Sequence, residues 1–486
     1  MLKWFKRSAP RKVFVAGLDC APPPVLFHTG AEETLGLKEQ LPNLGRLIDE
    51  GIYGPLSSSI PCITVPAWTS MLASKDPGEL GFYGFRNRAD HSYDRMSIAT
   101  SNAIHDRRVW EVLNEAGKTS AVVGVPQTYP IKPFDGYMIS SFLTPSTQRQ
   151  YTHPHELRYE IDRVLDGAEY DVDVPRFRTD DKDFLLRQIQ EMTEKRFAVI
   201  KYLLREKPWD FFMFVEIGLD RLHHGMWKYW DPGHVKHEPG NPYESAIPDY
   251  YRYLDREMGE ILGMLDDETV VMLVSDHGAQ AMEGGFAINE WLRKEGLLVL
   301  KSEPRYEGIV PFEKVEVDWE QTSAWGAGGY YARVFMNVEG RETHGKIPAG
   351  DYEKVRDELK ARIKAIPDHA GDPMDSVVFK PDALYRRVRP LQDGGAVPPD
   401  LMVYFGDLRW RSMGSFGIPE IYTFENDLGP DDANHAQDGV FVLWDPRHNH
   451  GGRYVEGLQL MDVAPTVLNL MQVPVPPDMQ GKVVSR

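Results

Sequence analysis

The sequence FFMFVEIGLDRLHH occupies residues 211–224 and joins an apolar run at 211–219 to an acid and two histidines. Apolar runs of this length are typical of strands buried on both faces of a parallel sheet. Two more runs have the same form, because VFVAGL at 13–18 precedes Asp19 and TVVMLVS at 269–275 precedes Asp276. With a fourth run, GVFVLW at 439–444, these segments predict the buried strands of one sheet.

Helical patterns separate the predicted strands. Residues 42–50 begin with a proline, place three apolar side chains on one face and end before a glycine, as a helix does. Similar patterns predict helices at 109–116, 250–265 and 460–470. Strands alternating with helices predict an α/β fold with a largely parallel central sheet and helices on both faces.

Two stretches interrupt this alternation, at about residues 144–208 and 282–398. The first is rich in charge and helix formers, whereas the second mixes helix, strand and loops rich in glycine and proline. Within the second stretch, we expect a strand at 330–337 and a helix at 351–366. We interpret residues 12–486 as one catalytic domain, in which the two insertions form a cap over the active site.

The composition excludes several classes of partner. A formal net charge of -18 would repel a nucleic-acid polymer or an anionic membrane, although bound cations can still make one pocket positive. Two cysteines are too few for a disulfide framework, and the basic start of the chain lacks the apolar stretch of a signal peptide. With no run of about 18 apolar residues, we expect no membrane span and a cytoplasmic location. The oligomeric state is not indicated.

The acids that follow the predicted strands suggest a metal site. A single Asp in this position is more often a helix cap or a turn former. However, the carboxyl ends of parallel strands meet at one edge, so Asp19, Asp220 and Asp276 should converge there, and they would repel unless a cation joined them. His224 lies four residues after Asp220, on the same face of a helix, and His277 follows Asp276 directly. These spacings favour a divalent cation held by carboxylates and imidazoles.

Thr64 lies in SSSIPCITVPAWTSM, where two prolines indicate a turn before a predicted helix at 67–73. A hydroxyl at a helix start is commonly a cap. It can also be a nucleophile, because coordination to a metal lowers its pKa and the helix N-terminus favours a phosphate. The local pattern permits both interpretations.

The ordered set of motifs resembles the alkaline phosphatase superfamily, and most closely its type I phosphodiesterase/nucleotide pyrophosphatase branch and predicted phosphohydrolase/phosphomutase relatives. The motifs are GLD at 17–19, TVPAW at 64–68, DRLHH at 220–224, SDHG at 275–278, NHAQDGVF at 434–441 and MDVAPTVLNLM at 461–471. The resemblance covers the core from about residue 12 to 482 and excludes much of both insertions.

The resemblance implies two divalent metal ions and a threonine nucleophile. One metal would be held by Asp220, His224 and His435, and the other by Asp19, Asp276, His277 and Thr64. Nitrogen and oxygen ligands suit Zn²⁺, with Mn²⁺ as the alternative. Thr64 would attack phosphorus, the alcohol or nucleotide would leave, and water would then hydrolyse the phosphothreonine.

We expect the substrate to be a small phosphate ester, either nucleotide-like or another organic phosphodiester. In this family an Asn about twenty residues after the nucleophile binds a phosphoryl oxygen, and here either Arg86 or Asn87 corresponds to it. An Asn would suit a diester, whereas an Arg would suit a dianionic monoester. We therefore predict a phosphodiesterase/nucleotide pyrophosphatase, with a phosphomonoesterase or phosphomutase as the alternative and a non-catalytic, metal-stabilised binding protein as a remote one. A sulfatase is disfavoured, because residues 62–66 lack the required Cys, Pro and Arg spacing.

Overall fold

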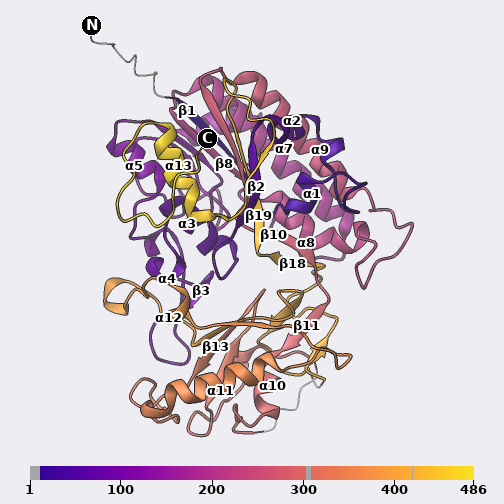
Figure 1. The fold of residues 1–486 in the computed structure, drawn as a ribbon, viewed down its shortest axis with the longest axis vertical. Coiled ribbons are helices and arrows are strands. Elements are labelled where there is room, and N and C mark those ends of the chain that lie inside the picture. The colour runs from indigo at the N-terminus through magenta and orange to yellow at the C-terminus, as the bar shows by residue number, and fades with distance from the viewer. Residues whose placement is uncertain (1–10, 303–307, 419, 486) are drawn as a thin grey trace.

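The computed structural model describes residues 11–302, 308–418 and 420–485. Figure 1 shows a large lobe built on a central sheet and a smaller lobe beneath it, with most of the chain in the large lobe. Among the described residues, none of the helices combines the length and the apolar character needed to cross a membrane.

The central sheet has ten strands, in the order β20–β2–β19–β9–β1–β8–β5–β6–β7, with β21 also paired to β2. The strands are β1 (Lys12–Leu18), β2 (Ile52–Ser57), β5 (Ser120–Val123), β6 (Gly136–Ile139), β7 (Thr152–His153), β8 (Phe211–Glu216), β9 (Thr269–Val274), β19 (Asp438–Trp444), β20 (Arg453–Tyr454) and β21 (Leu458–Gln459). The five strands from β9 to β6 are parallel, and β19 is antiparallel to both β9 and β2. The predicted mostly parallel α/β fold is confirmed.

The four apolar runs are the four strands at the centre of the sheet. Every residue of β8 and β9 is buried, as expected for strands covered on both faces. The apolar run at 211–219 forms a shorter strand than predicted, because β8 ends at Glu216 and helix α8 begins at Gly218. The Glu216 carboxylate accepts a hydrogen bond from the Gly218 amide at 2.7 Å, which fixes this sharp transition. Asp220 therefore lies in the first turn of a helix rather than directly after a strand.

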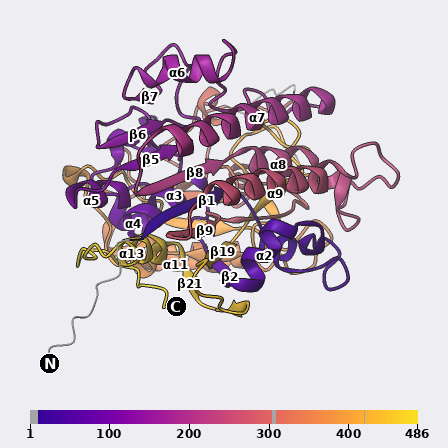
Figure 2. The ribbon, with the colours of Figure 1, turned by 90° about the horizontal axis from the view of Figure 1, so that it is seen from above.

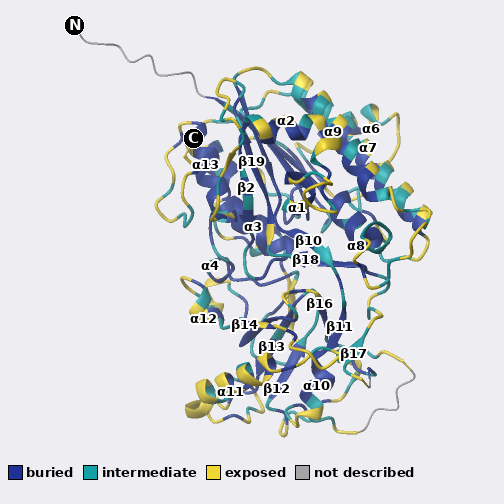
Figure 3. Cartoon of the chain, turned by 45° about the vertical axis from the view of Figure 1, so that its right-hand side comes forward, coloured by how far each residue is buried: buried dark blue, intermediate teal, exposed yellow. Residues whose placement is uncertain are grey.

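Helices cover both faces of the sheet (Figure 2). One face packs against α1 (Pro23–Phe27), α2 (Pro42–Glu50), α6 (Leu157–Val164), α7 (Lys182–Glu206), α8 (Gly218–Trp230) and α9 (Ala246–Met264). The other face packs against α3 (Thr64–Ala73), α5 (Val109–Glu115) and α13 (Val463–Leu470). Figure 3 shows the strands between these layers as a buried interior.

The first expected insertion, at residues 144–208, belongs largely to the core of the large lobe. Its long helix α7 packs on the sheet, where the Phe197 ring lies 5.6 Å from that of Phe214 on β8. The apolar face of α7 requires this cover, so the helix forms part of a core layer and not of a cap. The loop before it, at residues 165–181, reaches the active-site side of the lobe through Asp173 and Arg178.

The second expected insertion, at residues 282–398, forms most of the small lobe, which has a hydrophobic core of its own. The small lobe contains the sheets β12–β13–β15–β14 and β16–β11–β17, with helices α10 (Ile288–Lys294), α11 (Tyr352–Lys364) and α12 (Pro381–Leu384). The strands are β11 (Gly284–Ala287), β12 (Ala324–Ala327), β13 (Ala332–Met336), β14 (Val377–Phe379), β15 (Leu401–Tyr404), β16 (Trp410–Met413) and β17 (Tyr422–Thr423). Because β15, β16 and β17 complete these sheets, the lobe extends past residue 398 to Thr423. The expected strand at 330–337 and helix at 351–366 correspond to β13 and α11.

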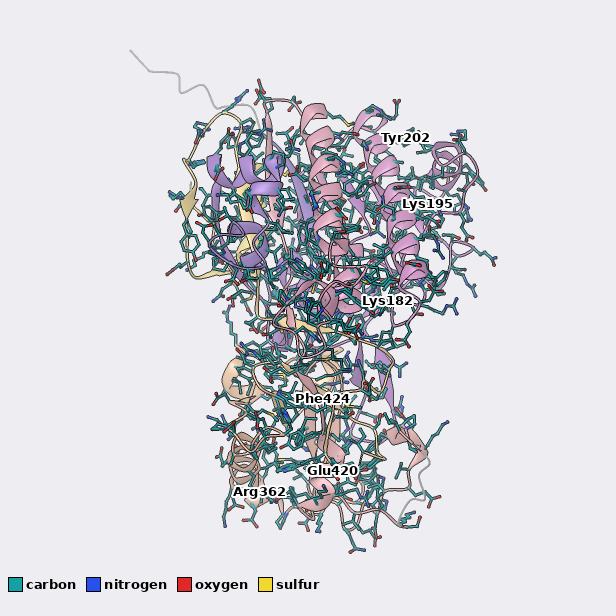
Figure 4. The ribbon with its side chains drawn as sticks, turned by 90° about the vertical axis from the view of Figure 1, so that its right-hand side faces the viewer. Lys182, Lys195, Tyr202, Arg362, Glu420 and Phe424 are labelled. Atoms are coloured by element: carbon teal, nitrogen blue, oxygen red, sulfur yellow. The ribbon has the colours of Figure 1, made fainter. Side chains whose placement is uncertain are left out.

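Charged and aromatic side chains meet at the junction between the lobes, among them Arg178, Asp431 and Tyr330. Figure 4 shows it from the side, with Lys182 at the start of α7 just above it and Phe424 just below. The β10–β18 ribbon, formed by Gly278–Ala281 and Ala433–Ala436, crosses the same region. The chain thus enters and leaves the small lobe next to the carboxyl ends of the central strands.

Candidate active site

The predicted site residues meet where the parallel strands end, at the face of the large lobe that adjoins the small lobe. Asp19 follows β1, Asp276 and His277 follow β9, and His435 lies on β18. Helix α3 begins with Thr64, and the first two turns of α8 carry Asp220 and His224. The structure brings together seven buried side chains, which are Asp19, Thr64, Asp220, His224, Asp276, His277 and His435.

The first of two groups that could hold a cation consists of Asp220, His224 and His435. The Asp220 Oδ1 atom lies 3.4 Å from His224 Nε2 and 3.9 Å from His435 Nε2. The spacing of four residues along α8 therefore places Asp220 and His224 on one face, as predicted. His435 reaches them because β18 pairs with β10, in a register that sets it opposite Ala279.

The second group that could hold a cation consists of Asp19, Asp220 and His277. Two more site residues lie beside this group, Asp276 and Thr64. The His277 Nε2 atom lies 3.2 Å from Asp276 Oδ2, 3.9 Å from Asp19 Oδ1 and 3.5 Å from Thr64 Oγ1. The two groups are adjacent, since Asp220 belongs to both and the rings of His277 and His435 stack with centroids 3.7 Å apart.

The atoms that face the centre of these groups are the ones that would bind a metal. Four of them are buried and have no hydrogen-bond partner among the described residues: Asp19 Oδ1, His224 Nε2, Asp276 Oδ2 and His435 Nε2. Buried polar atoms rarely remain unpaired unless a ligand or an ion satisfies them. The donor set of carboxylate oxygens and imidazole nitrogens without thiolate therefore fits divalent ions such as Zn²⁺.

The electrostatics of the cluster also favour cations. Burial, together with neighbouring carboxylates, raises the pKa of Asp19 and of Asp276 well above the usual range. Burial lowers the pKa of His277 to about 4 and that of His435 well below its ordinary value, so both imidazoles keep a free lone pair at neutral pH. Crowded carboxylates beside neutral imidazoles create a site in which a divalent cation relieves repulsion.

Thr64 is not a helix cap in the structure. It is the first residue of α3, and the cap position belongs to Ile63. The Thr64 hydroxyl instead faces His277, and the residue is only 5% exposed. At this position a phosphate at the hydroxyl would also lie at the N-terminus of a ten-residue helix, where backbone N–H groups and the helix dipole favour an anion.

Trp68 fixes Asp19 relative to α3, and sequence reasoning had not assigned it this role. The Trp68 Nε1 atom donates a hydrogen bond to Asp19 Oδ2 at 2.7 Å. Gly17 makes the contact possible, because a Cβ atom at that position would lie 2.7 Å from the Trp68 ring. The tryptophan therefore anchors the helix that carries Thr64 to Asp19, the residue after β1.

Three further residues around the first group were missed. Asp431 contacts His224, Arg221 pairs with Asp220 at 2.6 Å, and the Tyr330 ring lies against both His224 and His435. Their sequence signals are weak, because an Asp in a loop or a Tyr after two glycines is common in proteins and has no fixed role there. Tyr330 comes from the small lobe, so both lobes contribute to the site.

Neither candidate for the phosphoryl-binding position contacts the seven residues through a hydrogen bond or ion pair in the described part of the chain. The Arg86 side chain is exposed on β3 (Arg86–Arg88). The Asn87 amide closes its own loop, since it accepts a hydrogen bond from the Tyr83 amide and donates one to Gly84. The two assignments stay predictions about the substrate complex.

The fold and this cluster define the class of protein, because a mostly parallel sheet with buried carboxylates and imidazoles at its strand ends is the architecture of alkaline phosphatase-like enzymes. The family model for type I phosphodiesterase / nucleotide pyrophosphatase matches residues 27–431, and the chain belongs to that family. The resemblance inferred from the motifs is confirmed. Members of the family are metalloenzymes that hydrolyse phosphoric esters.

Solved structures share the fold, and two of them show the extent of the similarity. Phosphonoacetate hydrolase from Sinorhizobium meliloti 1021, in complex with phosphonoformate, is 15% identical with a TM-score of 0.57, over 95% of this chain and 96% of that one. Murine ectonucleotide pyrophosphatase / phosphodiesterase 5, as an inactive form in complex with AMP, is 12% identical with a TM-score of 0.52, over 96% of both chains.

A sulfatase is among the curated relatives. N-acetylgalactosamine-6-sulfatase of Canis lupus familiaris is 23% identical over 252 residues, covering 49% of this chain and 46% of that protein. The chain therefore spans about half the length of the curated relatives it matches. Cys62 gives no support to sulfatase chemistry, because it packs in the apolar cluster with Tyr83 and Tyr404, and burial raises the pKa of its thiol to about 12.

Proposed function

We propose that this protein is a metal-dependent phosphodiesterase or nucleotide pyrophosphatase that cleaves a small organic phosphodiester through a phosphothreonine on Thr64. The observation that carries the proposal is the position of the Thr64 hydroxyl, 3.5 Å from His277 Nε2 and beside two groups of potential ligands. Asp220, His224 and His435 would hold one ion, and Asp19, Asp276 and His277 the other, with Thr64 next to it. Zn²⁺ is the proposed metal, with Mn²⁺ as the alternative.

The chemistry of the chain itself follows from this placement. The Thr64 oxygen loses its proton and attacks phosphorus, a new P–O bond forms, and the ester oxygen opposite leaves with its electron pair and takes up a proton as the free alcohol. Water then attacks phosphorus, the P–O bond to Thr64 breaks, the phosphate monoester is released, and a proton from the water restores the Thr64 hydroxyl. Divalent ions bound here would lower the pKa of the hydroxyl and neutralise charge on the nonbridging and leaving oxygens.

The backbone at the start of α3 supports the same step. The phosphoryl group on Thr64 would lie at the positive end of the helix, where the first N–H groups have no partner within the helix. Such preorganised donors act on negative charge as it develops and require no rearrangement. The proposed ion ligands and the N-terminus of α3 thus both lie beside the Thr64 hydroxyl oxygen. A binding protein without turnover would not need a hydroxyl at this position.

A comparison of substrates tests the ester class. With enzyme saturated with Zn²⁺ or Mn²⁺, we expect kcat/KM for a nitrophenyl diester to exceed that for a nitrophenyl monoester by at least roughly tenfold, equivalent to about 1.4 kcal/mol of transition-state binding. Arg86→Ala serves as an internal test, since an exposed side chain that takes no part in diester cleavage should leave kcat/KM within about twofold.

A strong preference for the monoester would replace the first proposal with the alternative, a phosphomonoesterase or phosphomutase. In that case Arg86→Ala should abolish most of the preference, because a guanidinium recognises a dianion through paired hydrogen bonds. We further propose a nucleotide-like substrate and a cytoplasmic location, which agrees with two buried free cysteines, Cys20 and Cys62.

A further inference from the structure

We infer that Asp431 is a positioning residue that orients His224 and strengthens its hold on one of the two ions. This inference rests on the proposed function, because it presupposes that His224 is a metal ligand. The Asp431 carboxylate is fully buried, and its Oδ1 atom lies 2.7 Å from His224 Nδ1. Because His224 Nε2 faces Asp220, an ion would bind Nε2, and Nδ1 would then keep its hydrogen and donate a hydrogen bond to the Asp431 carboxylate.

The other two imidazoles of the site are oriented differently. His435 Nδ1 donates to the Cys62 carbonyl at 2.8 Å, and His277 Nδ1 donates to the Gly278 carbonyl at 3.1 Å. Both acceptors are neutral backbone groups. His224 Nδ1 also lies 3.0 Å from a backbone carbonyl, that of Ala433, but Asp431 adds a closer, charged acceptor at 2.7 Å. An imidazole that donates to a carboxylate is a more basic and more rigid ligand. The two ion sites should consequently differ in affinity.

The second oxygen of Asp431 is itself held in place. Its Oδ2 atom accepts hydrogen bonds from Arg178 Nε at 3.0 Å and from Asn426 Nδ2 at 3.3 Å, and Arg411 Nη1 lies 3.6 Å away. The guanidinium groups of Arg178 and Arg411 therefore keep the Asp431 carboxylate charged and restrict its rotation. Because the Asp431 carboxylate is held in place, it also holds the His224 ring in one orientation. A fixed ring orientation keeps Nε2 directed at the proposed ion site.

The same contacts join the two lobes at the site. Arg178 also donates from Nη2 to the Tyr330 hydroxyl at 2.5 Å, and the Tyr330 ring stacks on His224 with centroids 4.9 Å apart. Arg178 comes from the loop before α7, Tyr330 from the small lobe and Asp431 from the connection back to the large lobe. His224 is thus oriented by three segments that are far apart in the sequence.

Metal titration of Asp431→Asn tests the inference. The amide can still accept a hydrogen bond from His224 but lacks the negative charge, so we expect affinity for one ion to fall about 10- to 100-fold while the other ion binds as in the wild type. The measurement is a titration of metal-free enzyme with Zn²⁺ against a competing chelator. The absorption spectrum of the Co²⁺-loaded enzyme provides a second readout, in which only one of two sites should change.

Asp432→Asn is the matched control, because it removes the same charge at the adjacent residue. The Asp432 carboxylate points toward Lys228, at 3.6 Å, and we expect both ions to bind within about twofold of the wild type. Unchanged affinity in Asp431→Asn, or equal weakening of both ions, would overturn the inference. If this variant does not fold, Asp431→Glu replaces it, with a smaller loss again confined to one ion. A wild-type chain that binds no metal would instead refute the proposed function.

Discussion

Replacing Thr64 with alanine is expected to abolish ester hydrolysis while leaving the metal content nearly unchanged. The hydroxyl is the proposed nucleophile, and removing a nucleophile from an enzyme that uses covalent catalysis lowers kcat by roughly 10⁴-fold or more. Metal binding should persist, because the carboxylates and imidazoles around Thr64 remain in place. The measurements are kcat on a nitrophenyl diester and metal analysis of the same preparation.

Thr69→Ala is the matched control, since Thr69 lies on the same helix and is also buried. Its hydroxyl donates to the Val65 carbonyl at 2.9 Å, away from the ligand cluster, so kcat should stay within a few fold of the wild type. Hydrolysis by Thr64→Ala at a rate close to that of this control would exclude the phosphothreonine. In the wild type, mass spectrometry of acid-quenched enzyme should detect, on the peptide that contains Thr64, a phosphoryl group that still carries the retained ester group of the diester.

Replacing Asp220 with asparagine is expected to have the second large effect, on metal binding and activity together. Asp220 belongs to both ligand groups, with its Oδ1 atom 3.4 Å from His224 Nε2 and 3.9 Å from His435 Nε2. Loss of its charge removes an anionic ligand from one ion and increases the repulsion between two neighbouring cations. We expect weaker metal binding at both sites and kcat lowered by roughly 10³-fold, equivalent to about 4 kcal/mol.

Asp173→Asn controls for the effect on Arg221, which pairs with both carboxylates. Arg221 lies 2.6 Å from Asp220 and 2.9 Å from Asp173, so each variant removes one of its two anionic partners. Only Asp220 faces the ligand cluster, and the Asp173 variant should retain both ions. Equal losses in the two variants would show that the arginine pair, and not a metal ligand, accounts for the effect.

The sequence predicted the parts of the site that depend on local geometry. A buried strand places the next residue at one edge of the sheet, which was sufficient for Asp19 and Asp276, and the spacing of four along a helix was sufficient for Asp220 and His224. His435 and Thr64 needed the family resemblance, because a lone histidine and a threonine near two prolines have no distinctive pattern. The structure places all of these side chains within one cluster.

Features that depend on distant parts of the chain could not be read from local patterns. The apolar run of β19 predicts a strand, but not that it runs antiparallel between β9 and β2. Helix α7 appeared to belong to an insertion because it is charged along one side, whereas its other side packs on the sheet. Asp431 contacts a residue 207 positions away, so its role became visible only in three dimensions.

Anomalous X-ray diffraction from crystals of the active, metal-loaded enzyme would test the two-metal account most directly. Data collected at the metal absorption edge locate bound ions independently of any assumed ligands. We expect two peaks, one among Asp220, His224 and His435 and the other among Asp19, Asp276 and His277 beside the Thr64 oxygen. Active crystals without either peak, or with ions bound only outside this cluster, would contradict it.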